Sequence, residues 1–115
     1  MWKIEKENRV FLALGITDMR KAINGLSILV ESELDGVLFS GDLFVFCNRS
    51  RNIVKILYWD RNGFCLWQKR LEKEKFRWPE NEAEVMEVGC QELEWLLGGL
   101  DIAQAHEQLA YETVT

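Results

Sequence analysis

The alternation of apolar and polar residues predicts that the chain begins with a strand followed by a helix. Within residues 8–15, apolar side chains fall alternately on the two sides of an extended chain. The next segment carries apolar residues every three or four positions, which is the spacing of an amphipathic helix. We expect this long helix to begin at Thr17, a good N-cap residue type, and to end near Gly36. Its apolar stripe consists of Met19, Ile23, Leu26, Val30 and Leu34.

Three further apolar segments predict an antiparallel meander. Residues 41–48 are apolar on both faces, which is typical of a central strand, and residues 53–60 and 64–72 supply the next two strands. Turns are expected at residues 49–52 and 60–63, and the second turn contains Asn-Gly, a strong hairpin signal.

The C-terminal third predicts a short strand and a short helix. Residues 84–88 have strand character, and residues 90–99 have leucines on one helical face before a Gly-Gly stop. The predicted fold is therefore α+β: a mostly antiparallel sheet packed against one long N-terminal helix, with a short C-terminal helix. We expect one domain over residues 1–100, and residues 101–115 to form a frayed helix or a flexible tail.

Composition is consistent with one soluble domain of a reducing compartment. The chain has 115 residues, of which 48% are hydrophobic, enough for a core. No apolar run approaches the roughly 20 residues of a membrane span, and the N-terminus is too charged for a signal peptide. The three cysteines (Cys47, Cys65 and Cys90) are dispersed, which argues against a disulfide framework. We therefore expect a cytoplasmic protein without a membrane partner.

Charge is divided into blocks along the chain. The formal net charge is -5, yet residues 49–79 hold nine Lys and Arg against three acids, so this block carries +6. Residues 80–115 hold nine acids and no Lys or Arg, so they carry -9. The block of residues 49–79 also contains three of the five tryptophans. The pattern indicates one basic surface on an acidic molecule.

The basic block predicts a nucleic-acid interface, because cations bind phosphates and exposed aromatic rings stack on unpaired bases. The alternative is an ordinary two-faced strand with its tryptophans in the core and its lysines in solvent. The candidate residues in this block are Arg49, Arg51, Lys55, Lys69, Arg70, Lys73, Lys75, Arg77 and Trp78.

Arg20 and Lys21 form a second candidate at the start of the predicted first helix. Cations in a first turn oppose the helix dipole, whereas together with free backbone N–H groups they would bind an anion. The alternative is that Arg20 pairs with Asp18, Asp60 or another carboxylate.

The sequence offers no motif for catalysis. It lacks a phosphate-binding loop, a dinucleotide fingerprint and a Ser-His-Asp arrangement, so we expect neither catalytic residues nor a cofactor. Asp18, Asp42 and Asp60 make a weak candidate for a metal site, and no metal is expected. Trp95 could anchor a protein partner, but a domain of this size needs most of its large apolar groups in the core.

Several strings resemble a known family. In chain order they are DMRK, FSG, FVF, K-LYWD, GF, KRLE and FRWP, spread from about Val10 to Asp101. They resemble the small accessory protein, called TnpB or Orf2-like, of insertion-sequence-66-type transposons. The family's signature falls on Asp18, Met19, Arg20, Lys21, Lys55, Tyr58, Trp59, Asp60, Lys69, Arg70, Leu71, Phe76, Arg77, Trp78 and Pro79.

This resemblance implies a non-catalytic helper encoded beside a separate transposase. The expected partners are DNA at the transposon ends and the transposase itself, and the protein could form a homo-oligomer. The expected function is an accessory role in transposition with DNA phosphates bound by the basic block. The alternative is an adaptor that docks on the transposase without contacting DNA.

Overall fold

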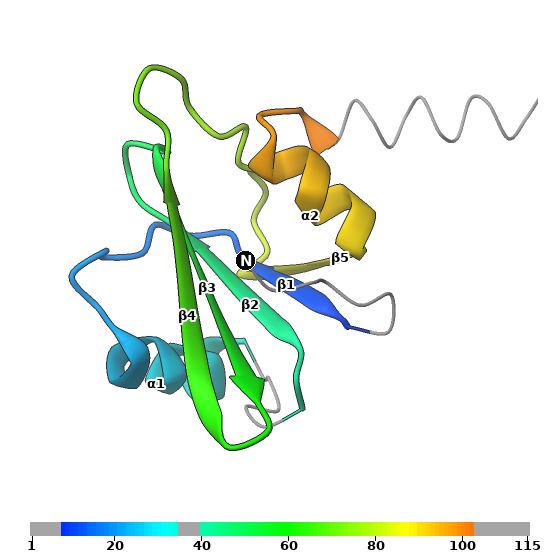
Figure 1. The fold of residues 1–115 in the computed structure, drawn as a ribbon. Coiled ribbons are helices and arrows are strands. Elements are labelled where there is room, and N and C mark those ends of the chain that lie inside the picture. The colour runs from blue at the N-terminus through cyan, green and yellow to red at the C-terminus, as the bar shows by residue number, and fades with distance from the viewer. Residues whose placement is uncertain (1–7, 35–39, 103–115) are drawn as a thin grey trace, which may run out of the picture.

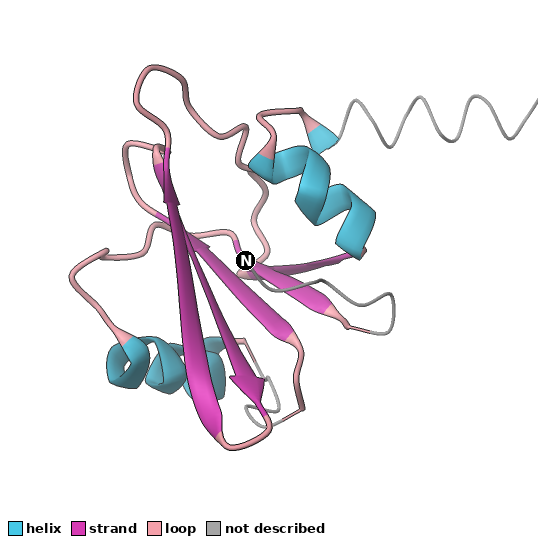
Figure 2. Ribbon diagram, viewed as in Figure 1, coloured by secondary structure: helices cyan, strands magenta, loops and turns pink. Residues whose placement is uncertain are grey.

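The computed structural model describes residues 8–34 and 40–102, and shows a five-stranded sheet with one helix on each face (Figures 1 and 2). The α+β class predicted from the sequence is confirmed. In chain order the elements are β1 (Val10–Ala13), α1 (Ile23–Glu33), β2 (Leu43–Cys47), β3 (Ile53–Asp60), β4 (Gly63–Arg70), β5 (Val85–Val88) and α2 (Cys90–Leu97).

The sheet is mixed, with strand order β4-β3-β2-β1-β5. The predicted meander of β2, β3 and β4 is antiparallel, and β5 pairs antiparallel with β1. The expectation of a mostly antiparallel sheet needs correction at β1, which runs parallel to β2 from Val10↔Leu43 to Leu12↔Val45. A parallel neighbour requires a crossover connection, and the segment containing α1 supplies it.

The prediction of a long first helix is wrong. Helix α1 has 11 residues and its N-cap is Ala22. Tertiary hydrogen bonds hold the residues before it in another conformation: Thr17 is buried and its N–H donates to the carbonyl of Cys47 at 3.0 Å. Asp18 Oδ1 accepts from the N–H of Arg20 at 2.9 Å, a local turn that competes with helix formation. Residue 36, where the helix was expected to end, lies outside the described residues.

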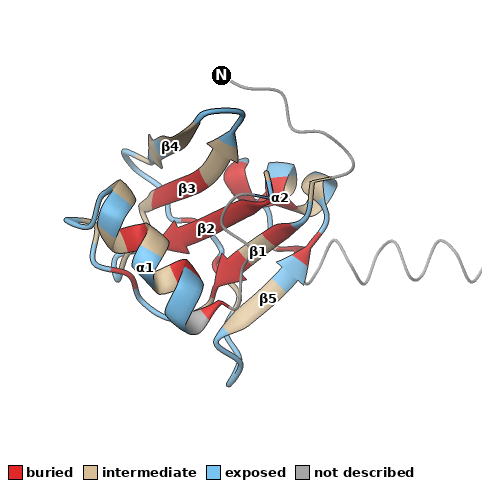
Figure 3. Ribbon diagram, turned by 90° about the horizontal axis from the view of Figure 1, so that it is seen from below, coloured by how far each residue is buried: buried red, intermediate tan, exposed pale blue. Residues whose placement is uncertain are grey.

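Each face of the sheet carries its own hydrophobic core (Figure 3). On one face the side chains of α1 pack on β2 and β3; the buried residues here are Ala13, Leu26, Val30, Leu34, Phe44, Phe46 and Leu57. On the other face α2 packs on β1, β2 and β3, and Leu93 and Leu96 are fully buried. The residues of β2 are buried on both sides, as predicted for a central strand.

The segment of residues 71–80 helps to cover the face that carries α2. It leaves the edge strand β4, and the chain reaches the opposite edge strand β5 after residue 84. Phe76 and Trp78 are 1% and 6% exposed and belong to the same core as α2. The indole N–H of Trp78 donates to the carbonyl of Ala13 at 3.1 Å, and the N–H of Phe76 donates to the carbonyl of Arg51 at 2.7 Å.

We predict that Trp78→Ala lowers the free energy of unfolding by about 3–5 kcal/mol, because it leaves a large cavity and removes the donor to Ala13. Urea unfolding followed by circular dichroism measures the change. The matched control is Lys75→Ala in the same segment, whose exposed side chain should change stability by no more than about 0.5 kcal/mol. A loss below about 1 kcal/mol for Trp78→Ala would contradict the role of this segment in the core.

Candidate nucleic-acid interface

Four exposed cations lie at the end of the sheet where β2 leads into β3 and β4 ends. We name Arg49, Lys73, Lys75 and Arg77 the cationic surface. Arg49 lies in the β2–β3 turn, and the hydrogen bond between Phe76 and Arg51 holds residues 71–80 against that turn. The side chains of the cationic surface make no hydrogen bond or ion pair to any described residue.

The alternation of burial along residues 75–78 explains why these cations face solvent. Phe76 and Trp78 point into the core, so Lys75 and Arg77 between them point outward. Adjacent side chains of an extended segment point in opposite directions. The two aromatic residues therefore orient the neighbouring cations, and they do so without being exposed themselves.

Two predicted site lysines have structural positions instead. Lys55 is 8% exposed, and its ammonium donates to the carbonyls of Met19 and Lys21 at 2.7 and 2.9 Å. Lys69 donates to the carbonyl of Leu97 at the C-terminal end of α2, at 2.9 Å. A cation at a helix C-terminus stabilises the carbonyls that have no partner within the helix. Lys55 thus connects β3 to the loop before α1, and Lys69 connects β4 to the end of α2.

Three predicted site arginines each contact a carboxylate. Arg51 pairs with Glu80. Arg70 Nε lies 3.2 Å from Glu72 Oε1, and Arg20 Nη2 lies 2.7 Å from Asp18 Oδ2. Arg51 and Arg70 belong to the basic block, so two of its nine cations already have a carboxylate partner.

Arg20 and Asp18 form the pairing that the sequence left open as one of two alternatives. Hydrogen bonds from the Arg20 side chain and backbone lower the pKa of the Asp18 carboxyl from 3.8 to about 2, and the same contact raises the pKa of Arg20. The pair is therefore charged at neutral pH and is lost as pH falls through about 2. Helix α1 begins at Ile23, so the proposed anion site in its first turn does not contain Arg20.

The sheet separates the predicted site into two parts. Lys55 shares a strand face with Leu57, which belongs to the core under α1, so the loop that Lys55 holds lies on that face. Arg20 and Lys21 are in this loop. Residues 71–80 cover the opposite face. The predicted cations are therefore divided between the two faces of the sheet, and they do not form one continuous interface.

The aromatic residues of the basic block are not a stacking platform. Trp78 is buried, and Trp67 packs against the core under α2. Trp59 is half-buried and meets the ring of Phe64 edge-on, with 5.0 Å between ring centroids. Within residues 71–80, where cations are exposed, both aromatic side chains are buried.

A groove with a volume of about 1160 Å³ lies beside the cationic surface. Residues 74–80 line it together with Gly99, Asp101 and Ile102. Lys75 and Arg77 line it together with acidic and apolar side chains. The lining of the groove is thus mixed in charge and partly apolar.

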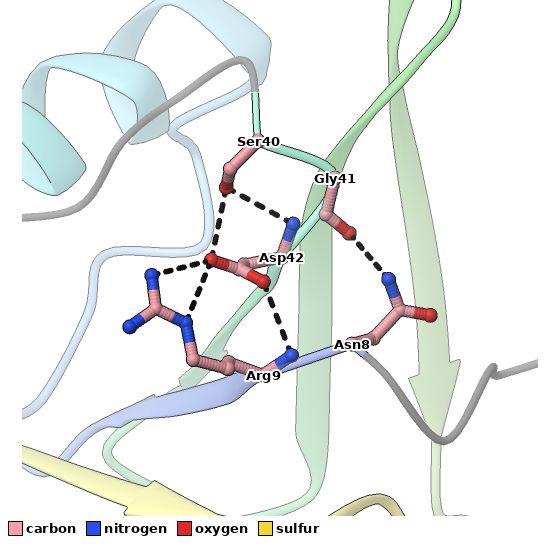
Figure 4. Close-up of polar contacts among 5 residues, drawn as sticks. All are labelled: Asn8, Arg9, Ser40, Gly41 and Asp42. Carbon is pink, nitrogen blue, oxygen red and sulfur yellow. Dashed lines mark hydrogen bonds and ion pairs between the residues drawn. The ribbon is translucent and has the colours of Figure 1, made fainter.

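A polar cluster that the sequence did not single out joins the starts of β1 and β2 (Figure 4). Asp42 is 6% exposed and accepts from the backbone and guanidinium of Arg9 and from the hydroxyl of Ser40. Asn8 donates to the carbonyl of Gly41 at 3.0 Å. The carboxylate of Asp42, one of the weak metal-ligand candidates in the sequence, thus accepts hydrogen bonds from Arg9 and Ser40. Across residues 8–34 and 40–102, no cluster of three metal-ligating side chains occurs.

Comparison with known protein families finds one family whose model matches this chain. The model of the family described as "IS66 Orf2 like protein" matches residues 8–107, which is most of the chain. The chain belongs to the IS66 Orf2-like family. The resemblance inferred from the sequence strings is therefore confirmed, and it connects this fold with insertion sequences.

Two curated relatives of this IS66 Orf2-like chain are proteins of Sinorhizobium fredii, both described as uncharacterized. The chain is 38% identical to protein y4hO over 93 residues, which cover 81% of each chain. It is 34% identical to protein y4jC over 93 residues, covering 81% of this chain and 80% of y4jC. No solved structure matches the chain. Among the described residues, no helix has the length and apolar character needed to cross a membrane.

We predict that Lys55→Met destabilises the protein by about 1–3 kcal/mol, because two backbone carbonyls lose their charged donor. Chemical unfolding measures the loss. Lys73→Met is the matched control, since Lys73 is exposed and bonds to no described residue, and it should change stability by no more than about 0.5 kcal/mol. Equal stability of the two variants would show that Lys55 has no structural role.

Proposed function

We propose that this IS66 Orf2-like protein is a non-catalytic accessory protein for transposition, and that it contacts DNA phosphates through the cationic surface. Family membership supports the connection with transposition. The observation that carries the DNA contact is the set of exposed cations without partners among the described residues. Lys and Arg that neutralise phosphates release counterions, which drives sequence-independent binding.

The geometry favours duplex DNA over single strands. Proteins that bind single strands place exposed aromatic rings beside their cations, and each stacked base contributes about 1–3 kcal/mol. Here Phe76 and Trp78 are buried beneath the cations. The cationic surface therefore offers phosphate contacts without base stacking, and the separate transposase would supply sequence recognition.

The groove beside the cationic surface favours a second candidate function, docking on the transposase. Its lining combines Lys75 and Arg77 with acidic residues and with apolar side chains such as Met86 and Ile102. Such a mixture suits a peptide better than a phosphate chain, because interfaces combine an apolar centre with a polar rim. Capture of the purified transposase without DNA, together with no shift of any DNA probe, would favour the adaptor.

We predict steep salt dependence of duplex binding. If all four cations of the cationic surface contact phosphates, the slope of log K against log salt is about -3.6, at about 0.9 per phosphate. Replacing Lys73, Lys75 and Arg77 together by Gln should reduce the slope to about -0.9. Fluorescence anisotropy with a labelled terminal-repeat duplex measures both slopes. A single strand of the same sequence should bind more weakly.

The control for this titration compares two single variants. Lys75→Gln removes a cation from the cationic surface, whereas Arg61→Gln removes one from the β3–β4 turn at the opposite end of the hairpin. Arg61→Gln should leave the slope unchanged. Affinity that does not depend on salt, or equal loss from both variants, would exclude the cationic surface as the DNA contact.

We predict that Glu80→Gln strengthens DNA binding, because it releases Arg51 from its ion pair and removes a negative charge beside the groove. The salt slope should become steeper by about 0.9, the contribution of one additional phosphate contact. The control, Glu82→Gln, makes the same change in net charge at an exposed residue without a described ion pair. If both variants behave alike, Arg51 does not contribute a phosphate contact when released.

A further inference from the structure

A cavity with a volume of about 470 Å³ lies on the face of the sheet that carries α1, and we name it the α1 pocket. Leu29 and Leu34 of α1 and Phe46 of β2 line it, and they belong to the core under α1 or pack against that core. Residues 14–18, which follow β1, and the segment before β5 also contribute to the lining. The volume is within the range of about 300–1,000 Å³ that is usual for sites that bind small molecules.

The α1 pocket contains a buried hydroxyl that has no partner among the described residues. Thr17 lines the pocket and is 6% exposed. Its backbone N–H donates to the carbonyl of Cys47, but its side chain makes no hydrogen bond to any residue that the structure describes. Buried polar side chains are nearly always hydrogen-bonded, and an unpaired one is costly. A ligand that accepts a hydrogen bond from Thr17 would remove this cost.

Lys21 brings a positive charge to the same pocket. Its N–H donates to the carbonyl of Asp18 at 3.1 Å, which closes a four-residue turn directly after Thr17. The stem of Lys21 passes over Gly25 of α1, where a Cβ atom would lie 3.2 Å from Cβ and Cγ of the lysine. Hydrogen bonds from Arg20 lower the pKa of Asp18 most, and the charge of Lys21 lowers it further. The ammonium of Lys21 therefore acts on another residue of the lining.

Two carboxylates also line the α1 pocket. Asp18 is paired with Arg20, so these two charges offset each other and leave Lys21 as the cation without an ion pair to a described residue. Glu84 lies in the segment before β5, and its carbonyl accepts from the N–H of Leu14. Its side chain is exposed, so water screens its charge. An amine that pairs with Glu84 is therefore the competing kind of ligand, and the experiment below includes one.

Apolar groups make up the rest of the lining. Leu34 and Phe46 are 5% and 1% exposed and form a rigid wall. Ile16, which also lines the pocket, is 63% exposed, so its side chain presents apolar surface that a ligand can cover. Pockets of this composition bind molecules with an apolar body, and a few polar groups fix the orientation.

We propose that the α1 pocket binds a small carboxylic acid with an apolar body, with its carboxylate held by Lys21 and Thr17. The two oxygens of a carboxylate accept hydrogen bonds from both donors at once. A phosphate group has more charge and more oxygens than one ammonium and one hydroxyl can satisfy, which makes it the poorer match. The hydrocarbon or aromatic body of the acid lies against Leu29, Leu34 and Phe46.

This site goes beyond the proposed function and does not depend on it. The apolar wall of the pocket belongs to the core under α1, whereas residues 71–80, which carry three of the four cations of the cationic surface, cover the opposite face. A ligand of the α1 pocket therefore leaves the cationic surface open. The test requires no DNA, so its result is separate from that of the salt titration.

The first test compares acids with neutral and cationic analogues. Phenylacetate and hexanoate, each titrated to about 10 mM, should give saturable NMR shifts at the amides of Thr17 and Lys21 and at the methyl groups of Leu29. The amide of Lys75, on the opposite face, should not shift. Phenylacetamide and 2-phenylethylamine carry the same ring without the negative charge and should bind at least about tenfold more weakly than phenylacetate. Absence of saturable shifts with both acids, or equal binding of the amine, overturns the proposal.

The second test removes the cation of the site. Lys21→Met keeps the stem over Gly25 and deletes the charge, so it should weaken phenylacetate binding about tenfold or more. Binding of phenylacetamide should not change. Lys73→Met makes the same change in net charge at the cationic surface and is the matched control, which should leave the affinity for phenylacetate unchanged. Equal loss of affinity in the two variants would refute a specific role of Lys21.

The third test concerns the buried hydroxyl. Thr17→Val replaces it by a methyl group, and because the hydroxyl has no partner among the described residues, the urea midpoint of the free protein should not fall. Phenylacetate binding should weaken about tenfold, and Thr17→Ser, which keeps the hydroxyl, should retain it. Lower stability of Thr17→Val with unchanged affinity would show that the hydroxyl serves the fold and overturn its role here. If Thr17→Val does not fold, the analogue series and Lys21→Met decide the matter.

Discussion

The burial of β2 on both faces is the constraint on which the rest of the structure depends. All five of its residues are buried, so apolar groups must cover the sheet from two sides. Helix α1 covers one side. On the other side α2 is too short to do this alone, and Phe76 and Trp78 of the segment after β4 complete the core. Because that segment alternates aromatic and cationic residues, completing the core also turns Lys75 and Arg77 toward solvent.

The basic block serves two purposes that its composition does not distinguish. Lys55 and Lys69 donate to backbone carbonyls and join covering segments to the sheet. Arginines such as Arg51 are balanced by carboxylates. Four of the remaining cations lie in the β2–β3 turn and along residues 71–80, whereas Arg61 lies at the other end of the hairpin. The surface that we propose binds phosphates is therefore smaller than the sequence indicates, because it contains only the cations that have no ion pair with a described residue.

The amino-acid sequence by itself determined the meander, its turns, the central position of β2 and the family, because apolar periodicity and turn residues act over a few positions. The sequence also contained a signal for the parallel pair, because a strand, a helix and another strand follow one another along the chain. The prediction of an antiparallel sheet did not use this signal. Tertiary structure alone decided that the first helix starts at Ile23 and that Trp78 and Lys55 are buried. These outcomes depend on contacts between residues distant in the chain, such as Lys55 with Met19 and Trp78 with Ala13, and local patterns carry no information about such partners.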